Sequence, residues 1–135
     1  MRTRTIATLA AILVGLEGAA ILALAGWQLV AVLTGDTASI ASALALLVLT
    51  LVGGVAVLAF AVAIYNGRSW GRSGAIVTQV LVFAVALGAA TGDFAHPLTA
   101  MLIAAPAVVT FVLLILAARD AGREASAQES PEKSL

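Results

Sequence analysis

The chain offers few groups capable of catalysis or ion binding, and the carboxyl of Glu17 is the most unusual of them. Glu17 lies inside an apolar stretch that runs roughly from Thr5 to Leu33. The chain has no Cys, so disulfides and thiolate metal sites are excluded. Its single His, His96, has only Asp93 close by in the chain, which is too small a ligand set for a metal. We therefore expect no metal site and no cofactor.

A carboxyl in an apolar segment either binds a proton or cation, or acts as a hydrogen-bonding group that holds helices together. No Lys, Arg or His occurs in any of the apolar stretches, so Glu17 has no cationic partner there. An unpaired carboxylate is costly in hydrocarbon, so we expect a neutral acid that needs a hydrogen-bond partner. The residue types leave both roles open.

Three polar residues at a depth comparable with that of Glu17 are candidate partners for it. Gln79, Thr50 and Thr110 each lie about 16 to 20 Å from the outer end of their own apolar stretch, at 1.5 Å per residue. Gln79 is the preferred partner, because its amide group both donates and accepts. Pro106 is expected to kink its helix and to leave one backbone carbonyl without its usual donor.

These residues lie in four apolar stretches, each of which approaches or exceeds the ~20 residues that cross a ~30 Å hydrocarbon layer. The chain is 62% hydrophobic and 10% charged, whereas soluble domains are nearer half apolar and a quarter charged. We predict an all-α membrane protein in which residues 1–118 form four transmembrane helices in an up-down-up-down bundle. The predicted spans are 5–33, 38–65, 74–90 and 97–118.

The basic residues predict the orientation of these spans. Lys and Arg concentrate on the cytoplasmic side of membrane proteins. Here they precede the first span, separate the second from the third, and follow the fourth, whereas the connections around Asp36 and Asp93 contain none. Both termini are therefore predicted to be cytoplasmic. The basic residues are Arg2, Arg4, Arg68, Arg72, Arg119, Arg123 and Lys133.

Two segments have their own interpretations. Ala23-Leu24-Ala25 resembles a signal-peptide cleavage site, but the apolar run continues to Leu33 and contains Glu17, which favours a retained span. Residues 119–135 are polar and of mixed charge, and we expect them to form a disordered cytoplasmic tail. The net charge is zero, which argues against a nucleic-acid partner and leaves the lipid bilayer as the expected one.

The tripeptides Thr34-Gly35-Asp36 and Thr91-Gly92-Asp93 predict two matching turns at the outer face. Gly permits a positive φ, and Asp is expected to cap the helix that follows. The match suggests that the chain consists of two related helical hairpins.

Small residues at helical spacing predict close helix packing. On the first helix they lie on the face roughly opposite Glu17, so one face is expected to pack within the chain and the other between chains. We therefore expect a homo-oligomer, most simply a dimer, or a complex with another membrane protein. The predicted packing residues are Ala11, Gly15 and Ala19 in the first span and Gly53 and Gly54 in the second.

The connection between the second and third spans is expected to lie in the lipid headgroup layer. Trp70 suits that layer because its ring has both a polar and an apolar environment there. Arg68 and Arg72 can contact lipid phosphates. Ser73 is the expected N-cap of the third helix.

This connection also resembles a known pattern. The run Asn66-Gly67-Arg68-Ser69-Trp70-Gly71-Arg72, followed by Gln79, is similar to one in small uncharacterised four-helix integral membrane proteins of actinobacteria. Those proteins commonly pair a Gly-Arg-x-Trp-Ala-Arg loop with a Gln in the third helix and an acid in the first. Gly71 stands where that pattern has Ala, and Gly74 where a Pro is frequent. The resemblance implies fold and bacterial membrane location but no activity.

Two functions remain as hypotheses. The first is a non-enzymatic structural or accessory subunit, with Glu17 as a structural hydrogen-bonding group. The alternative is a proton- or cation-coupled small transporter or channel that uses Glu17. An enzyme is not expected, because an active site would gather several convergent polar groups at one depth.

Overall fold

The structure, a computed structural model, describes residues 2–91 and 95–129 and contains four α-helices in these ranges. Each helix is long and apolar enough to cross a membrane. The predicted class, an all-α protein with four candidate membrane spans, is thereby confirmed. The helices are α1 (Arg2–Thr34), α2 (Ile40–Tyr65), α3 (Ser69–Thr91) and α4 (Pro97–Glu129).

Two helices are longer than the sequence predicted. Helix α4 continues to Glu129, so most of the segment expected to be disordered from Arg119 onward is helical. Residues 119–129 are rich in Ala, Arg, Glu and Gln, which are strong helix formers and extend a helix that is already nucleated. Helix α3 begins at Ser69 rather than near Gly74, so Ser73 lies inside it and donates to the Ser69 carbonyl at 3.4 Å instead of capping it.

Glycines with positive φ terminate the first two helices. Gly35 has a φ of 73° and Gly67 a φ of 74°, values that favour glycine. At the end of α2 the Arg68 amide donates to the Ala63 carbonyl at 2.8 Å, which is the Schellman arrangement. The turn predicted from Gly35 is therefore present, and Gly67 forms a second one.

The N-cap of α2 is Ser39, not Asp36 as the sequence suggested. The Ser39 side chain accepts a hydrogen bond from the Ser42 amide at 3.5 Å, and its backbone is extended. Asp36 instead belongs to the turn that ends α1, which places it too early to reach the first turn of α2. Gly92 and Asp93 lie outside the described residues, so the predicted match between the two turns stays a prediction.

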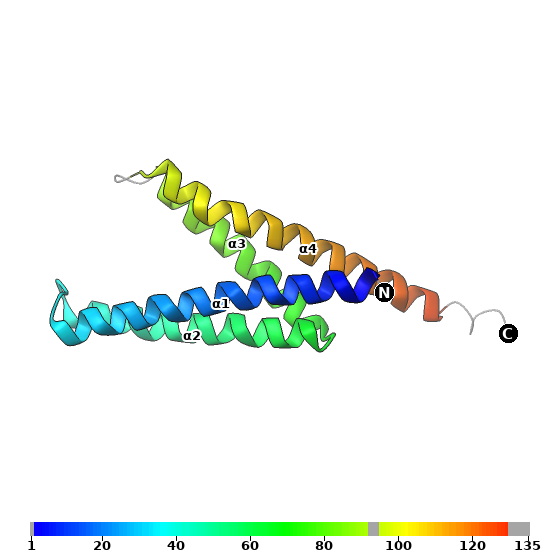
Figure 1. The fold of residues 1–135 in the computed structure, drawn as a ribbon, viewed down its shortest axis with the longest axis horizontal. Helices are drawn as coiled ribbons and strands as arrows, with labels where there is room; N and C mark the ends of the chain where they lie inside the picture. The colour runs from blue at the N-terminus through cyan, green and yellow to red at the C-terminus, as the bar shows by residue number, and fades with distance from the viewer. Residues whose placement is uncertain (1, 92–94, 130–135) are drawn as a thin grey trace.

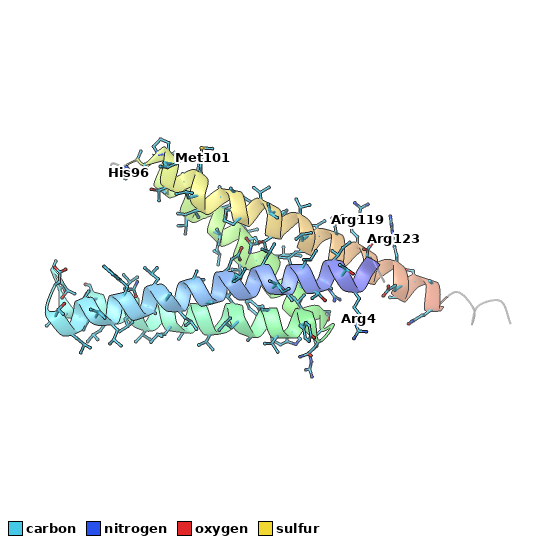
Figure 2. The ribbon with its side chains drawn as sticks, in the orientation of Figure 1. Arg4, His96, Met101, Arg119 and Arg123 are labelled. Atoms are coloured by element: carbon cyan, nitrogen blue, oxygen red, sulfur yellow. The ribbon has the colours of Figure 1, made fainter. Side chains whose placement is uncertain are left out.

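The helices pair as two hairpins that meet at one end. Helix α1 packs along α2, and α3 packs along α4. Figure 1 shows the two pairs close together where α2 turns into α3 and well apart at the other end, so that the molecule has the outline of a V. Figure 2 places Arg4, Arg119 and Arg123 at the closed end and His96 at an open tip. We call the closed end the basic end; its arginines are Arg4, Arg68, Arg72, Arg119 and Arg123.

The predicted packing residues divide into two groups. Ala11 is buried in the core, and a Cβ placed at Gly15 or Gly54 meets side chains of the neighbouring helix. Ala19 is exposed, and a Cβ at Gly53 meets nothing within 4 Å among the described residues. Three of the five positions thus pack inside the chain, whereas Ala19 and Gly53 do not. The core where the hairpins meet consists of Ala10, Ala11, Val14, Val57, Ala61, Ile64, Ala75 and Leu114.

Candidate functional site

Glu17 binds side chains from both helices of the opposite hairpin. The Gln79 Nε2 atom on α3 donates to Glu17 Oε2 at 2.6 Å. The Thr110 hydroxyl on α4 donates to Glu17 Oε1 at 2.9 Å. The structure therefore brings together three of the four polar residues singled out from the sequence. We call Glu17, Gln79 and Thr110 the polar site.

The polar site is largely shielded by protein. Gln79 and Thr110 are both 0% exposed, and Glu17 is partly buried. These neutral donors satisfy both carboxyl oxygens, and no Lys, Arg or His is among them. The free-energy cost of removing Glu17 from water is thus offset by hydrogen bonds rather than by an ion pair.

One buried atom of the polar site has no partner among the described residues. Gln79 Oε1 is buried and accepts no hydrogen bond within that part of the chain. Buried polar atoms are nearly always paired, and leaving one unpaired costs about 1–3 kcal/mol. The polar site therefore has an acceptor available for one more donor or for a cation.

Thr110 contacts two acceptors with a single hydroxyl hydrogen. Its Oγ1 lies 2.9 Å from Glu17 Oε1 and 3.0 Å from the Pro106 carbonyl oxygen. A hydroxyl has one donor hydrogen and two acceptor lone pairs. Thr110 can donate to only one of these oxygens at a time. Pro106 lies inside α4, which continues through it as a helix.

Thr50 does not join the polar site. Its hydroxyl donates to the Leu46 carbonyl of its own helix at 2.8 Å. A Cβ at Gly18, which follows Glu17 directly, would touch Leu58, so Leu58 marks the level of the polar site on α2. Thr50 lies about 12 Å along α2 from that level, at 1.5 Å per residue.

An apolar groove of about 800 Å³ passes beside the polar site. All four helices contribute to its lining, which is almost entirely apolar. Ile21 lies one helical turn beyond Glu17, and Thr78 and Val82 flank Gln79 along α3. The groove runs along α3 past the polar site, from Ser73 and Gly74 near the basic end to Val85. Its larger apolar residues include Leu24, Val57, Phe60, Leu81, Val85 and Ile103.

The three residues predicted to contact lipid headgroups lie at the basic end, in different environments. Trp70 packs edge-on against Phe60, with ring centroids 5.9 Å apart and planes at 72°. Arg72 Nη1 donates to the Gly67 carbonyl at 3.5 Å. Arg68 is exposed. Arg72 lines a cavity together with Arg4.

The sequence did not predict that Arg4 and Arg72 line the same cavity. The two arginines come from α1 and α3, and no local pattern connects positions so far apart in the chain. A shared position at the basic end was the only signal in the sequence. Within the described ranges, no three His, Cys, Asp or Glu side chains lie close enough to hold a metal ion.

Comparison of the chain with protein-family models, curated proteins and solved structures found no match. The resemblance to small actinobacterial membrane proteins and the bacterial location therefore remain predictions. The chain stands as a small integral membrane protein with four candidate spans.

Proposed function

We propose that this chain is a non-enzymatic protein of the bacterial cytoplasmic membrane that couples the protonation of Glu17 to movement of its two hairpins, as a small proton-coupled transporter. The observation that carries this proposal is the position of the Thr110 hydroxyl between Glu17 Oε1 and the Pro106 carbonyl. That position lets the polar site hold Glu17 in either protonation state.

In the ionised state, Glu17 accepts hydrogen bonds from Gln79 Nε2 and from the Thr110 hydroxyl. In the neutral state, the proton sits on Glu17 Oε1 and is donated to Thr110 Oγ1. Thr110 then turns its own hydrogen to the Pro106 carbonyl at 3.0 Å. Gln79 still donates to Glu17 Oε2. Rotation of one hydroxyl thus lets the polar site take up a proton. Protonation also removes the charge that strengthens both hydrogen bonds to Glu17, and this weaker link between the hairpins couples protonation to their movement.

The unpaired Gln79 Oε1 favours a site that binds a further donor or a cation over a site with a purely structural role. A site built only to hold helices together gains nothing from a buried acceptor without a donor. An intramembrane acid is by default a functional residue. Glu17 also lies where the hairpins begin to separate, so a change in its hydrogen bonds acts directly on the contact between them.

The pH dependence of the distance between the two open tips tests this coupling. The chain has no Cys, so Thr37→Cys and His96→Cys place one spin label on each tip. Replacing His96 also removes the only His, so no imidazole contributes to the measured pH response. Double electron–electron resonance spectroscopy in lipid vesicles is expected to show two populations of the distance between the labels, and their ratio should change with pH.

Glu17→Gln should abolish this change, whereas Thr50→Val, which alters a threonine outside the polar site, should preserve it. Vesicles loaded with a pH-sensitive dye should then acidify faster with the wild type than with Glu17→Gln under an imposed proton gradient. A pH response that persists in Glu17→Gln, or none in the wild type, would contradict the proposal.

A second candidate is the structural or accessory subunit. The observation that favours it is the set of open small residues on the bundle surface. Ala19 is exposed, and a Cβ at Gly26, Gly53 or Gly88 meets no atom within 4 Å among the described residues. Such positions allow another helix to approach closely, in a dimer or in a complex with a different membrane protein. This candidate predicts no proton flux from the wild type, and loss of association in Gly26→Leu or Gly88→Leu.

A further inference from the structure

A second cavity, of about 880 Å³, lies at the basic end between the hairpins. The start of α1, the connection between α2 and α3, and the last turns of α4 all line it. Its charged residues are Arg4, Arg72 and Glu124, and Asn66 and Gln128 add neutral polar groups. We call this cavity the basic-end pocket. It lies where the helices leave the apolar part of the chain, at the level expected for lipid headgroups.

The lining of the basic-end pocket has both polar and apolar residues. Ala7, Ala117 and Ala121 supply an apolar wall from α1 and α4, together with the buried Ile64. Positive charge exceeds negative charge, since two arginines face one glutamate. A ligand that fits this lining carries a negative charge and an attached hydrocarbon part. Soluble phosphate alone would leave the apolar wall without a partner.

We propose that the basic-end pocket binds the phosphate of an anionic phospholipid, with Arg4 and Arg72 contacting the phosphate oxygens and an acyl chain lying along the alanines. Guanidinium groups bind phosphate oxygens through charge-assisted hydrogen bonds. Basic pockets between transmembrane helices on the cytoplasmic side are suited to lipid headgroups. The bond from Arg72 to the Gly67 carbonyl holds this side chain against the connection that lines the pocket. Glu124 can accept a hydrogen bond from a headgroup hydroxyl.

Selective binding of phosphatidylglycerol tests this assignment. The full chain, purified in an uncharged detergent, is titrated with phosphatidylglycerol or phosphatidylcholine, and binding is measured by native mass spectrometry and by thermal unfolding. Phosphatidylglycerol should bind and raise the unfolding temperature, whereas phosphatidylcholine should not. The double variant Arg4→Gln/Arg72→Gln should weaken phosphatidylglycerol binding about 25-fold, at about fivefold for each arginine.

A matched control removes the same charge from the same end of the molecule. Arg119 and Arg123 lie on α4 and point away from Arg4 in Figure 2, and neither lines the pocket. Arg119→Gln/Arg123→Gln should therefore weaken binding by less than about threefold, as expected for screened surface charges. If both double variants weaken binding equally, the attraction is general electrostatics and the assignment is wrong.

A variant that fills the pocket tests whether its shape, as well as its charge, contributes to lipid binding. Ala121→Leu leaves every charge in place but narrows the space beside Arg4, so it should also reduce phosphatidylglycerol binding. This variant keeps the proposal testable should the arginine variants not fold. The last comparison replaces the lipid with inorganic phosphate at millimolar concentration. Stabilisation by phosphate equal to that by phosphatidylglycerol would assign the pocket to a soluble phosphate compound and overturn the lipid assignment.

Discussion

Helix α3 approaches the backbone of α2 closely at Gly71, and replacing Gly71 with Ala tests the packing of the basic end. An added Cβ at Gly71 would lie 2.5 Å from Ala63 Cβ and 2.9 Å from both the Ile64 amide nitrogen and the Phe60 carbonyl oxygen. Two of these three neighbours are backbone atoms of α2, which cannot rotate away as a side chain does. Gly71→Ala therefore requires α2 and α3 to move apart.

The loss of stability expected for Gly71→Ala follows from the distances between the added Cβ and its neighbours. Carbon atoms pack best at about 3.5–4.0 Å, so the helices must separate by about 1.0–1.5 Å at this point. Overpacking of this kind typically costs about 1–3 kcal/mol. Ala is a better helix former than Gly by up to about 1 kcal/mol, which works in the opposite direction. A Cβ at Gly88, also on α3, meets no atom within 4 Å among the described residues, so Gly88→Ala reports the propensity gain without the clash.

Equilibrium unfolding in mixed micelles, followed by helical circular dichroism, measures both variants. Gly71→Ala should be less stable than Gly88→Ala by about 1–3 kcal/mol. Gly74→Ala should fall between them, because its close neighbour is the Phe60 ring, which can turn aside. Equal stabilities for Gly71→Ala and Gly88→Ala would refute the tight crossing of α2 and α3, and with it the geometry of the basic end.

Three further substitutions probe the polar site, a turn and the core. Thr110→Val should destabilise the fold by about 1–3 kcal/mol in the same unfolding assay, since it leaves Glu17 Oε1 without its donor, while Thr110→Ser should retain most of the stability. Gly67→Ala should cost about 1–2 kcal/mol because its φ of 74° strains a residue with a Cβ; no measurable loss would argue against that turn. Leu114→Ala, at a site 0% exposed, should cost about 1–3 kcal/mol of stability. This is less than the about 2–5 kcal/mol typical of the cores of water-soluble proteins, because lipid is as apolar as the core. Leu102→Ala, at a site 67% exposed, should cost less than about 1 kcal/mol.

The fold class followed from the sequence because hydropathy and length act along each helix separately. A run of apolar residues longer than the hydrocarbon layer specifies a span whatever it packs against. The ends of the helices were less predictable, because capping residues and the helix propensity of their neighbours compete to decide where a helix starts and stops. Ser39 caps α2 where Asp36 was expected, and α4 extends to Glu129 because its polar residues are strong helix formers.

The polar site was partly predictable for a similar reason. Depth along each helix limits the partners of Glu17, and Gln79 and Thr110 lie at the right level. Thr50 has a similar depth when it is counted from the end of its own span, yet it lies about 12 Å along α2 from the polar site. The level that a residue reaches in the bundle also depends on where its helix crosses its neighbours. The unpaired Gln79 Oε1 and the cavity that Arg4 and Arg72 share also depend on the three-dimensional arrangement, which no local sequence pattern encodes.

The position of the polar site relative to the core explains why one acid can matter to the whole bundle. The core residues of α1 precede Glu17, the one on α3 precedes Gln79, and the one on α4 follows Thr110, so these lie toward the basic end from the polar site. On α2, Val57 lies level with the polar site, and Ala61 and Ile64 lie toward the basic end. Beyond it the hairpins diverge (Figure 1), and buried residues such as Leu47 and Ala86 lie in regions where each hairpin packs on itself. The hydrogen bonds of Glu17 are therefore among the last links between the hairpins in the direction of the open end. In the proposed coupling, their loss would extend an opening that already exists and leave the core intact. A carboxyl placed deeper in the core could not lose its hydrogen bonds in this way without breaking apolar packing as well.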